Sequence, residues 1–324
     1  MIETTGYTGN CCDGSGKKDR PVISADQIGT LVQLAGMENV FEHEPMSEHT
    51  TFRIGGPADV LVSPVTMEAL TGVIRYLDAE QIPYSVIGNG SNLLVGDKGY
   101  RGVIVQVYKN LSAITVEGST IKAEAGAMIS AVSRTAMTHG LTGLEFASGI
   151  PGTTGGAVVM NAGAYGGEMK DVIVSVTVLT PEGNIREIPA SDMAFGYRTS
   201  CVMKNHYIVL GAVFRLDEGK KDDILARMQE LKEKRVSKQP LDKPSAGSTF
   251  KRPEGYFAGK LIMDAGLKGF TVGGACVSEK HAGFVINNGG ATAQDVRQLI
   301  SHVQNEVKKR FGVSLECEIR MIGE

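Results

Sequence analysis

Two clusters of glycine and small polar residues are the parts of this sequence best suited to bind a ligand. The first, residues 88–92, reads Gly-Asn-Gly-Ser-Asn and directly follows the apolar run 84–87. Glycine lets backbone N–H groups approach a phosphate because no Cβ stands in the way, and Ser91 and Asn92 add side-chain donors. The same residues also suit a plain tight turn, and their spacing alone does not separate the two interpretations.

The second cluster, residues 148–157, reads Ser-Gly-Ile-Pro-Gly-Thr-Thr-Gly-Gly-Ala. Pro151 fixes one turn, the glycines allow others, and residues 155–157 can begin a helix with close backbone packing. Two such loops converging in one domain would clamp a pyrophosphate from two sides. A purely structural explanation needs two unrelated coincidences, so we interpret the pair as a ligand site.

The form of these loops argues against the two commonest nucleotide-binding folds. Neither loop reads Gly-x-Gly-x-x-Gly, and Gly-Lys-Ser/Thr occurs nowhere in the chain. A Rossmann dinucleotide fold and a P-loop NTPase are therefore disfavoured. No set of His, Asp, Glu or Cys has the spacing of a zinc site, so we predict no catalytic metal.

Composition narrows the remaining classes. The chain has 324 residues, of which 42% are hydrophobic, enough for a sizeable core. Its net charge is −3 and it has no basic block, so nucleic-acid binding is not expected. It has no apolar run long enough to cross a membrane and no secretory signal at its N-terminus. The five scattered cysteines suggest a reducing compartment, and we expect a cytoplasmic protein.

The character of the chain changes near residue 218. We expect a flexible leader at residues 1–22, mixed strands and helices up to 218, and a final part, 219–324, where charge rises and a helix begins. The main expected elements are a βαβ-like unit over 58–87, a helix near 128–139, a hairpin around 181–183, helices at 257–264 and from 292 onward, and a strand over 313–319.

Seven motifs, taken together, resemble one known family. They are TTFRIGGPA at 50–58, IGNGSNLL at 87–94, GLEFASGIPG at 143–152, NAGAYG at 161–166, YRTS at 197–200, GSTF at 247–250 and EIRMIG at 318–323. Their order and spacing resemble those of the UDP-N-acetylenolpyruvoylglucosamine reductases (MurB family) over about residues 27–323. Each motif alone is modest, but the ordered set is specific.

This resemblance implies an α+β fold: an FAD-binding fold of the vanillyl-alcohol-oxidase (PCMH) type in two subdomains, 23–100 and 101–218. The C-terminal domain, 219–324, would bind the substrate. The family carries non-covalent FAD and uses NADPH to reduce UDP-N-acetylglucosamine enolpyruvate to UDP-N-acetylmuramate for peptidoglycan synthesis. We expect a monomer. The short segment after Arg198 lacks a tyrosine-bearing insertion, so the chain resembles the family's second type.

The resemblance also implies which residues would contact the cofactor. The implied FAD-binding residues are Arg53, Gly88, Asn89, Gly90, Ser91, Asn92, Leu93, Ser148, Gly149, Ile150, Pro151, Gly152, Gly155, Gly156 and Ile208.

Three further residues match the family's catalytic positions. Ser248 would deliver a proton to an enolate-like carbon, which is basic enough to accept one from a hydroxyl held close. Arg198 would bind the enolpyruvyl carboxylate through its planar guanidinium. Glu318 would donate a hydrogen bond or serve as an alternative acid, and Glu316, two residues earlier on the same strand face, is its rival.

The implied substrate-binding residues are Tyr197, Arg198, Lys238, Arg252 and His281. Two other classes stay open. An oxidase on the same fold often holds FAD covalently through His or Cys in a glycine loop, and neither residue occurs at 88–93 or 148–157. A non-enzymatic nucleotide-binding protein would leave Ser248, Arg198 and Glu318 unexplained.

Overall fold

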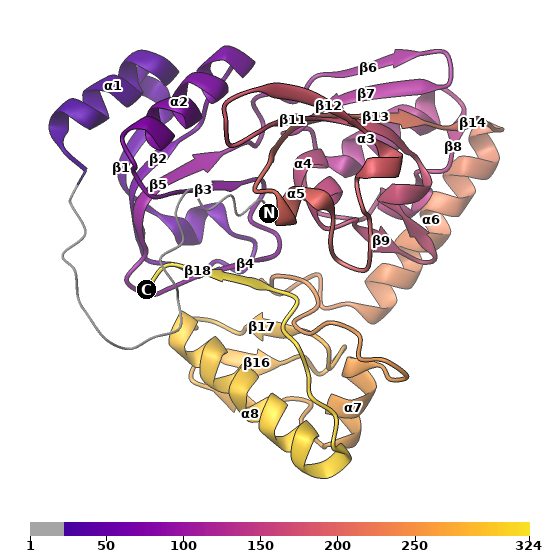
Figure 1. Cartoon of the computed structure of the whole chain (residues 1–324). Helices are drawn as coiled ribbons and strands as arrows, with labels where there is room; N and C mark the ends of the chain where they lie inside the picture. Colours follow the sequence, from indigo (N-terminus) through magenta and orange to yellow (C-terminus); the bar gives the residue numbers. More distant parts are fainter. Residues whose placement is uncertain (1–22) are drawn as a thin grey trace. The chain divides into compact units, whose positions relative to one another are not determined.

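The computed structural model describes residues 23–324, so the predicted leader at 1–22 lies outside the described residues. The chain forms two compact units (Figure 1). Unit 1 comprises residues up to Glu44, Ala58–Asn89 and Arg101–Lys232, and unit 2 comprises Pro45–Pro57, Gly90–Tyr100 and Glu233–Glu324. Each unit is described by itself below. The three-part division of residues 23–324 stays a prediction.

The first sheet of unit 1 has four strands, and helices α1 (Ala25–Ala35) and α2 (Met67–Ala79) belong to the same part of the chain. Its strand order is β1 (Val40–Pro45), β2 (Pro57–Val62), β5 (Tyr100–Gln106) and β3 (Tyr84–Ile87), with β3 parallel to β5. Helix α1 packs on α2. Ser24 caps α1 in a capping box with Gln27, and Thr66 caps α2 by accepting from the N–H of Ala69.

The second sheet of unit 1 carries the predicted hairpin. Its order is β12 (Ile185–Pro189), β11 (Ile173–Leu179), β13 (Ile208–Arg215), β7 (Thr120–Glu124) and β6 (Ile114–Glu117), all antiparallel. Leu179 pairs with Ile185 across the turn at 181–183. Helices α3 (Ile129–Thr138) and α4 (Thr154–Val159) pack against this sheet.

Short elements complete unit 1. They are β8 (Leu141–Thr142), β9 (Gly163–Ala164), β10 (Gly167–Glu168), α5 (Cys201–Lys204) and β14 (Asp217–Glu218), with 3-10 turns η1 (Met37–Asn39), η3 (Glu145–Ala147), η4 (Met169–Asp171) and η5 (Ala190–Asp192). Helix α6 (Lys221–Lys238) begins in unit 1 and ends in unit 2.

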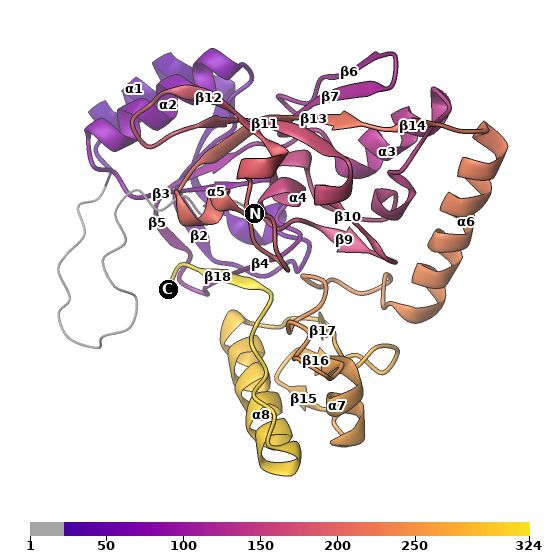
Figure 2. The ribbon, with the colours of Figure 1, turned by 45° about the vertical axis from the view of Figure 1, so that its right-hand side comes forward.

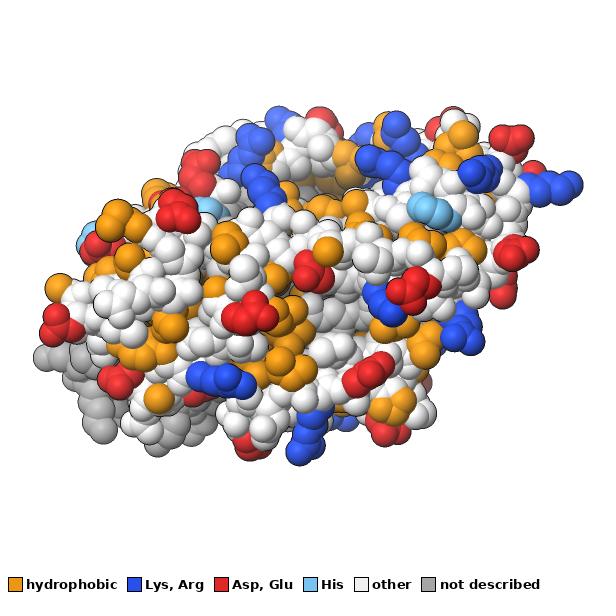
Figure 3. All heavy atoms as spheres, turned by 90° about the horizontal axis from the view of Figure 1, so that it is seen from above, with side chains coloured by type: hydrophobic (Ala, Val, Ile, Leu, Met, Phe, Trp, Pro, Cys, Tyr) orange, Lys and Arg blue, Asp and Glu red, His pale blue; other side chains and the backbone are white. Residues whose placement is uncertain are grey.

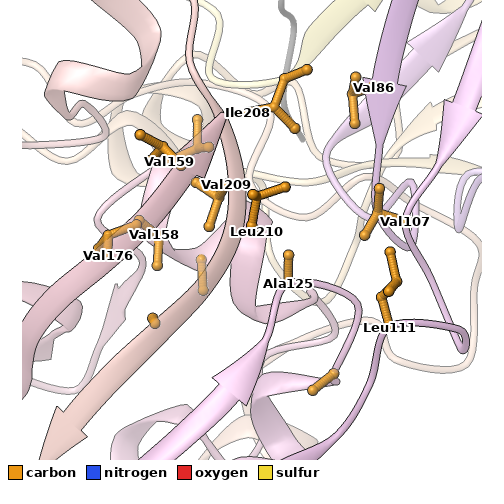
Figure 4. Close-up of a cluster of buried hydrophobic side chains, with 14 of the residues drawn as sticks. Val86, Val107, Leu111, Ala125, Val158, Val159, Val176, Ile208, Val209 and Leu210 are labelled. Atoms are coloured by element: carbon orange, nitrogen blue, oxygen red, sulfur yellow. The ribbon is translucent and has the colours of Figure 1, made fainter. Parts of the chain in front are cut away.

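One hydrophobic core joins the two sheets of unit 1. Figure 4 shows Val86 and Val107, from the β3–β5 side, on one side of Leu210 of β13, and Val158 of α4 on the other side. These side chains are almost completely buried. The backbone on either side of the predicted ligand loops is therefore held by close packing.

Unit 2 contains two small sheets and two helices. They are β4 (Leu93–Val95) parallel to β18 (Arg320–Ile322), the antiparallel set β15 (Thr271–Val272), β16 (Ala275–Val277) and β17 (Val285–Asn287), then α7 (Ala258–Asp264), α8 (Ala293–Phe311) and the 3-10 turn η2 (Met46–His49). The predicted helix from 292 onward forms as α8, and its apolar stripe is buried throughout: Val296, Leu299, Ile300, Val303 and Val307. Asp97 caps the same helix by accepting from the N–H groups of Ala293 at 2.7 Å and Gln294 at 2.9 Å.

The strand predicted at 313–319 is wrong in its bounds. The last strand, β18, begins at Arg320, because pairing with Leu93 of β4 starts there. Cys317 forms only an isolated bridge with Phe250.

Among the described residues, no helix combines the length and the apolar character needed to cross a membrane. Figure 3 shows positive, negative and hydrophobic side chains interspersed over the face that it presents.

Candidate functional site

The two predicted ligand loops meet within unit 1. A Cβ on Gly88, just after β3, would lie 2.4 Å from the hydroxyl oxygen of Thr153. Asn89 Nδ2 donates a hydrogen bond of 2.7 Å to the carbonyl of Pro151. The end of the first loop in unit 1 and the second loop therefore touch, and a side chain at position 88 has no room.

Hydrogen bonds to the backbone of residues 125–127 hold the second loop. Thr154 donates to the carbonyl of Ala127 through both its N–H (2.7 Å) and its hydroxyl (3.0 Å), and the N–H of Gly155 donates to Ala125 at 2.9 Å. Thr153 caps α4 by accepting from the N–H of Gly156. The predicted helix start at 155–157 is thus correct to within one residue.

The donor set of these loops fits a pyrophosphate. Residues 88–92 and 148–157 contain no carboxylate, include six glycines among fifteen residues, and offer backbone N–H groups with Ser, Thr and Asn side chains. The close approach at Gly88 also brings both loops to one place in unit 1. Such loops suit the pyrophosphate of a dinucleotide such as FAD, where an approaching anion meets donors and no opposing charge.

The rest of the first loop lies in unit 2. Gly90 has φ +60°, and a Cβ there would meet the carbonyl oxygen of His49 at 2.1 Å, so only glycine fits. Asn92 donates through Nδ2 to the carbonyl of Glu318 at 3.3 Å and accepts from the N–H of Arg320 at 2.9 Å. Leu93, next in the chain, starts strand β4, while Ser91 is half-buried.

Arg53, a predicted FAD residue, also lies in unit 2 and has a left-handed backbone with φ 54°. Its turn is closed by hydrogen bonds from the Arg53 N–H to the Thr50 carbonyl and from the Thr50 hydroxyl to the Ile54 carbonyl, both at 3.1 Å. The buried amide of Asn287 donates to the Phe52 carbonyl at 3.3 Å. These contacts hold the exposed arginine in a conformation that costs free energy elsewhere.

Backbone pairing in unit 2 joins the segment that carries Ser248 to the segment that carries Glu318. The N–H of Glu318 donates to the carbonyl of Thr249 at 2.8 Å, which places the glutamate opposite the residue that follows Ser248. The rival Glu316 forms an ion pair with Lys251 and is 72% exposed. Glu318 is half-buried and is thus the less exposed of the two carboxylates.

The segment that carries Ser248 is also hydrogen-bonded to the loop that carries His281. The N–H of Thr249 donates to the carbonyl of Gly283 at 2.9 Å, and the N–H of Gly283 donates to Nδ1 of His281 at 3.1 Å. His281 therefore carries its proton on Nε2. Burial lowers the pKa of His281, and the nearby positive charge of Lys238 lowers the pKa further. His281 is thus a neutral donor close to a lysine.

Arg252 is the remaining predicted substrate residue of unit 2. Its guanidinium carbon lies 4.0 Å from the centroid of the Phe257 ring, a cation–π contact between two exposed side chains.

Arg198 lies in unit 1, in a tight turn. The N–H of Gly196 donates to the Thr199 carbonyl at 3.1 Å, and the reverse bond is 3.4 Å. Arg198 has φ 56°, and its guanidinium carbon lies 5.1 Å from the ring of Tyr197. Ile208, a predicted FAD residue at the start of β13, is buried in the cluster of Figure 4.

Sequence reasoning missed several residues that shape these sites. Thr153 lies in the glycine cluster 148–157 and Asn161 begins the motif at 161–166, and these patterns were the available signal. Glu168 and Asn287 follow apolar or glycine-rich runs without a recognisable pattern, so nothing in the sequence marked them. Among residues 23–324, no group of three or more His, Cys, Asp or Glu side chains is arranged to hold a metal ion.

The fold and the loops define the class of protein. A family model described as an FAD binding domain matches residues 58–189, which contain both glycine loops. The chain is therefore an FAD-binding oxidoreductase, with the predicted α+β FAD-binding fold of the vanillyl-alcohol-oxidase type. A second model, the C-terminal domain of UDP-N-acetylenolpyruvoylglucosamine reductase, matches residues 239–322.

Full-length comparisons identify the family. A UDP-N-acetylenolpyruvoylglucosamine reductase from Caldanaerobacter subterraneus subsp. tengcongensis is 54% identical over 92% of this chain and 98% of its own length. One from Clostridioides difficile is 49% identical over 91% and 97%. The crystal structure of the enzyme from Thermus caldophilus aligns with a TM-score of 0.75 at 36% identity, over 86% of this chain and 97% of that one. The chain belongs to the UDP-N-acetylenolpyruvoylglucosamine reductase family, as the sequence motifs predicted.

Proposed function

We propose that this enzyme uses NADPH to reduce UDP-N-acetylglucosamine enolpyruvate to UDP-N-acetylmuramate, a step of peptidoglycan synthesis. The observation that supports the proposal is the backbone pairing in unit 2 between the segment that carries Ser248 and the segment that carries Glu318. The names of the relatives support the substrate. Monomeric state and cytoplasmic location stay predictions.

FAD, when bound, supplies the hydride chemistry between the nicotinamide and the enolpyruvyl group. Within unit 1, Gly88 and Asn89 and the loop at 148–156 would hold its pyrophosphate, with Gly88 meeting Thr153 and Asn89 bonded to Pro151. Gly90, Ser91 and Asn92 of unit 2 stay proposed contacts. Neither loop contains the His or Cys that a covalent link needs, which supports non-covalent binding. Arg53, Leu93 and Ile208 stay proposed contacts.

The residues of the chain would stabilise the charge that develops on the substrate. Reduction of the enolpyruvyl double bond leaves negative charge on the carbon beside the carboxylate, delocalised as an enolate. Arg198 would hold the carboxylate with its planar fork and stabilise this charge. Ser248 would give its hydroxyl proton to the carbon, and Glu318 would hydrogen-bond to the enolate.

The nucleotide half of the substrate carries a diphosphate, and unit 2 offers cations and a donor for it. Lys238 and Arg252 supply positive charge, and the neutral His281 supplies an Nε2–H. Tyr197 stacks under Arg198 and is proposed to line the sugar side.

The test separates the two half-reactions. Anaerobic NADPH should bleach the flavin absorbance, and UDP-N-acetylglucosamine enolpyruvate should then restore it. Ser248→Ala should leave the bleaching rate unchanged and slow the recovery by about 10²–10⁴-fold, the usual range for a general acid. Equal loss in both half-reactions would remove Ser248 from this role. Wild-type protein that bleaches without recovery would reject the substrate.

A further inference from the structure

The motif at 161–166 has no role in the site proposed above, yet the side chain of its first residue, Asn161, is buried and forms three hydrogen bonds. Asn161 is 1% exposed and has φ 41°. Its Nδ2 donates to Glu168 Oε2 at 2.9 Å and to the Gly196 carbonyl at 3.1 Å, and its Oδ1 accepts from the Lys170 N–H at 2.9 Å. The amide thus joins the β9–β10 hairpin to the turn that carries Arg198.

The turn is also tied to α4. The buried hydroxyl of Ser200 donates to the carbonyl of Val159, in the last residue of that helix, at 2.9 Å. Figures 1 and 2 both show α4 beside α5, the helix that begins directly after Ser200. The segment that carries Arg198 is therefore fixed on both sides of the arginine, at Gly196 and at Ser200.

Glu168 brings a negative charge to this turn. Its carboxylate accepts hydrogen bonds from Lys170 Nζ at 2.8 Å and from Asn161, and its side chain is 32% exposed. The hydrogen bond from Lys170 is the main cause that lowers the pKa of Glu168, and the Asn161 amide and the positive charge of Arg198 lower the pKa further. The positive charge of Arg198 is the smallest of these causes, and the geometric link between Glu168 and the turn of Arg198 is the Asn161 amide.

We propose that Glu168, held by Asn161, is a positioning residue for Arg198. This inference rests on the proposed function, in which Arg198 binds the enolpyruvyl carboxylate. A guanidinium has five N–H donors, so it can be oriented by one carboxylate and still present a fork to another. Asn161 fixes the carboxylate of Glu168 and the backbone at Gly196 together, so that Arg198 needs little rearrangement when substrate arrives.

The first test replaces the charge and keeps the shape. Glu168→Gln should raise KM for UDP-N-acetylglucosamine enolpyruvate and slow flavin reoxidation by about tenfold to a hundredfold, the effect of a misplaced binding group. Bleaching by NADPH, FAD content and Tm of the holoenzyme should not change. The matched control is Glu117→Gln. It breaks another Glu–Lys ion pair, in which Glu117 Oε2 lies 3.0 Å from Lys122 Nζ on the β6–β7 hairpin, and it should leave every rate unchanged.

A double-mutant cycle shows whether Glu168 acts through Arg198. Arg198→Lys alone should slow reoxidation, and adding Glu168→Gln to it should cost little more, because the group to be positioned is already lost. Glu168→Asp keeps the charge and should recover part of the rate lost in Glu168→Gln.

Additive effects in the cycle, or a Glu168→Gln enzyme with the reoxidation rate of the Glu117→Gln control, would overturn the positioning role. Loss of FAD or a lowered Tm in both Glu168 variants would also overturn it, by assigning this carboxylate to the stability of the fold. If the wild-type enzyme itself is not reoxidised by the substrate, the proposed function fails first, and the two failures are thereby distinguished.

Discussion

Gly88→Ala tests whether the close approach of the two loops holds the FAD pyrophosphate. The added Cβ would lie 2.4 Å from Oγ1, 3.1 Å from Cγ2 and 3.3 Å from Cβ of Thr153. Ordinary contact needs about 3.5 Å, so the loops must separate by roughly 1 Å. Thr153 is 2% exposed and caps α4, so it cannot turn aside easily. Overpacking of this kind costs about 1–3 kcal/mol.

This cost should appear in FAD affinity. Without cofactor the loops of the variant relax by moving apart, and binding must bring them back together. A cost of 1–3 kcal/mol corresponds to an FAD Kd weaker by about fivefold to a hundredfold. The assay is the rise in flavin fluorescence when the holoprotein is diluted. Gly29→Ala is the control, because a Cβ there has no neighbour within 4 Å and the residue lies in α1.

A second variant identifies the cause. Thr153→Ala removes the atoms that the new Cβ meets, at the cost of a helix cap of about 1 kcal/mol. The double variant should therefore bind FAD more tightly than Gly88→Ala alone. If Gly88→Ala retains FAD as well as Gly29→Ala does, the reasoning from loop contact is refuted. A double variant weaker than Gly88→Ala would show that the Thr153 contact is not the cause.

Two further predictions concern pH. Burial lowers the pKa of His281, so the folded state resists protonation and the free energy of unfolding should fall as the pH drops below about 6.5. Urea unfolding at pH 7.5 and 5.5 measures this difference, which should be smaller in His281→Gln than in the wild type. The hydrogen bond from the Thr292 backbone is the main cause that lowers the pKa of Asp295, so its stabilisation is present above about pH 4 and is lost as the pH falls. The Tm deficit of Asp295→Asn should accordingly shrink between pH 7 and pH 3, and a constant deficit would contradict this cause.

Local signals predicted the elements whose stability is local. The stripe of α8 follows from a 3.6-residue period and the β11–β12 hairpin from its turn residues, and both form as expected. The last strand was misplaced because its start depends on pairing with Leu93, more than two hundred residues away. A partner at that separation leaves no periodic signal around residue 313. The ordered motifs predicted the family, but they did not predict which side chains contact one another.

The backbone conformations at the candidate sites, which the sequence did not predict, share one physical feature. Arg53, Asn161 and Arg198 all have positive φ, at 54°, 41° and 56°, a region that residues other than glycine rarely adopt. Each is held there by hydrogen bonds from or to segments distant in sequence: Asn287 fixes the turn of Arg53, and Asn161 joins Glu168 to the turn of Arg198. Such conformations persist only where the surrounding structure enforces them. Local propensity therefore fails at these residues for the same reason that makes them candidates for function, and the buried amides that enforce the strain are where variants should separate binding from stability.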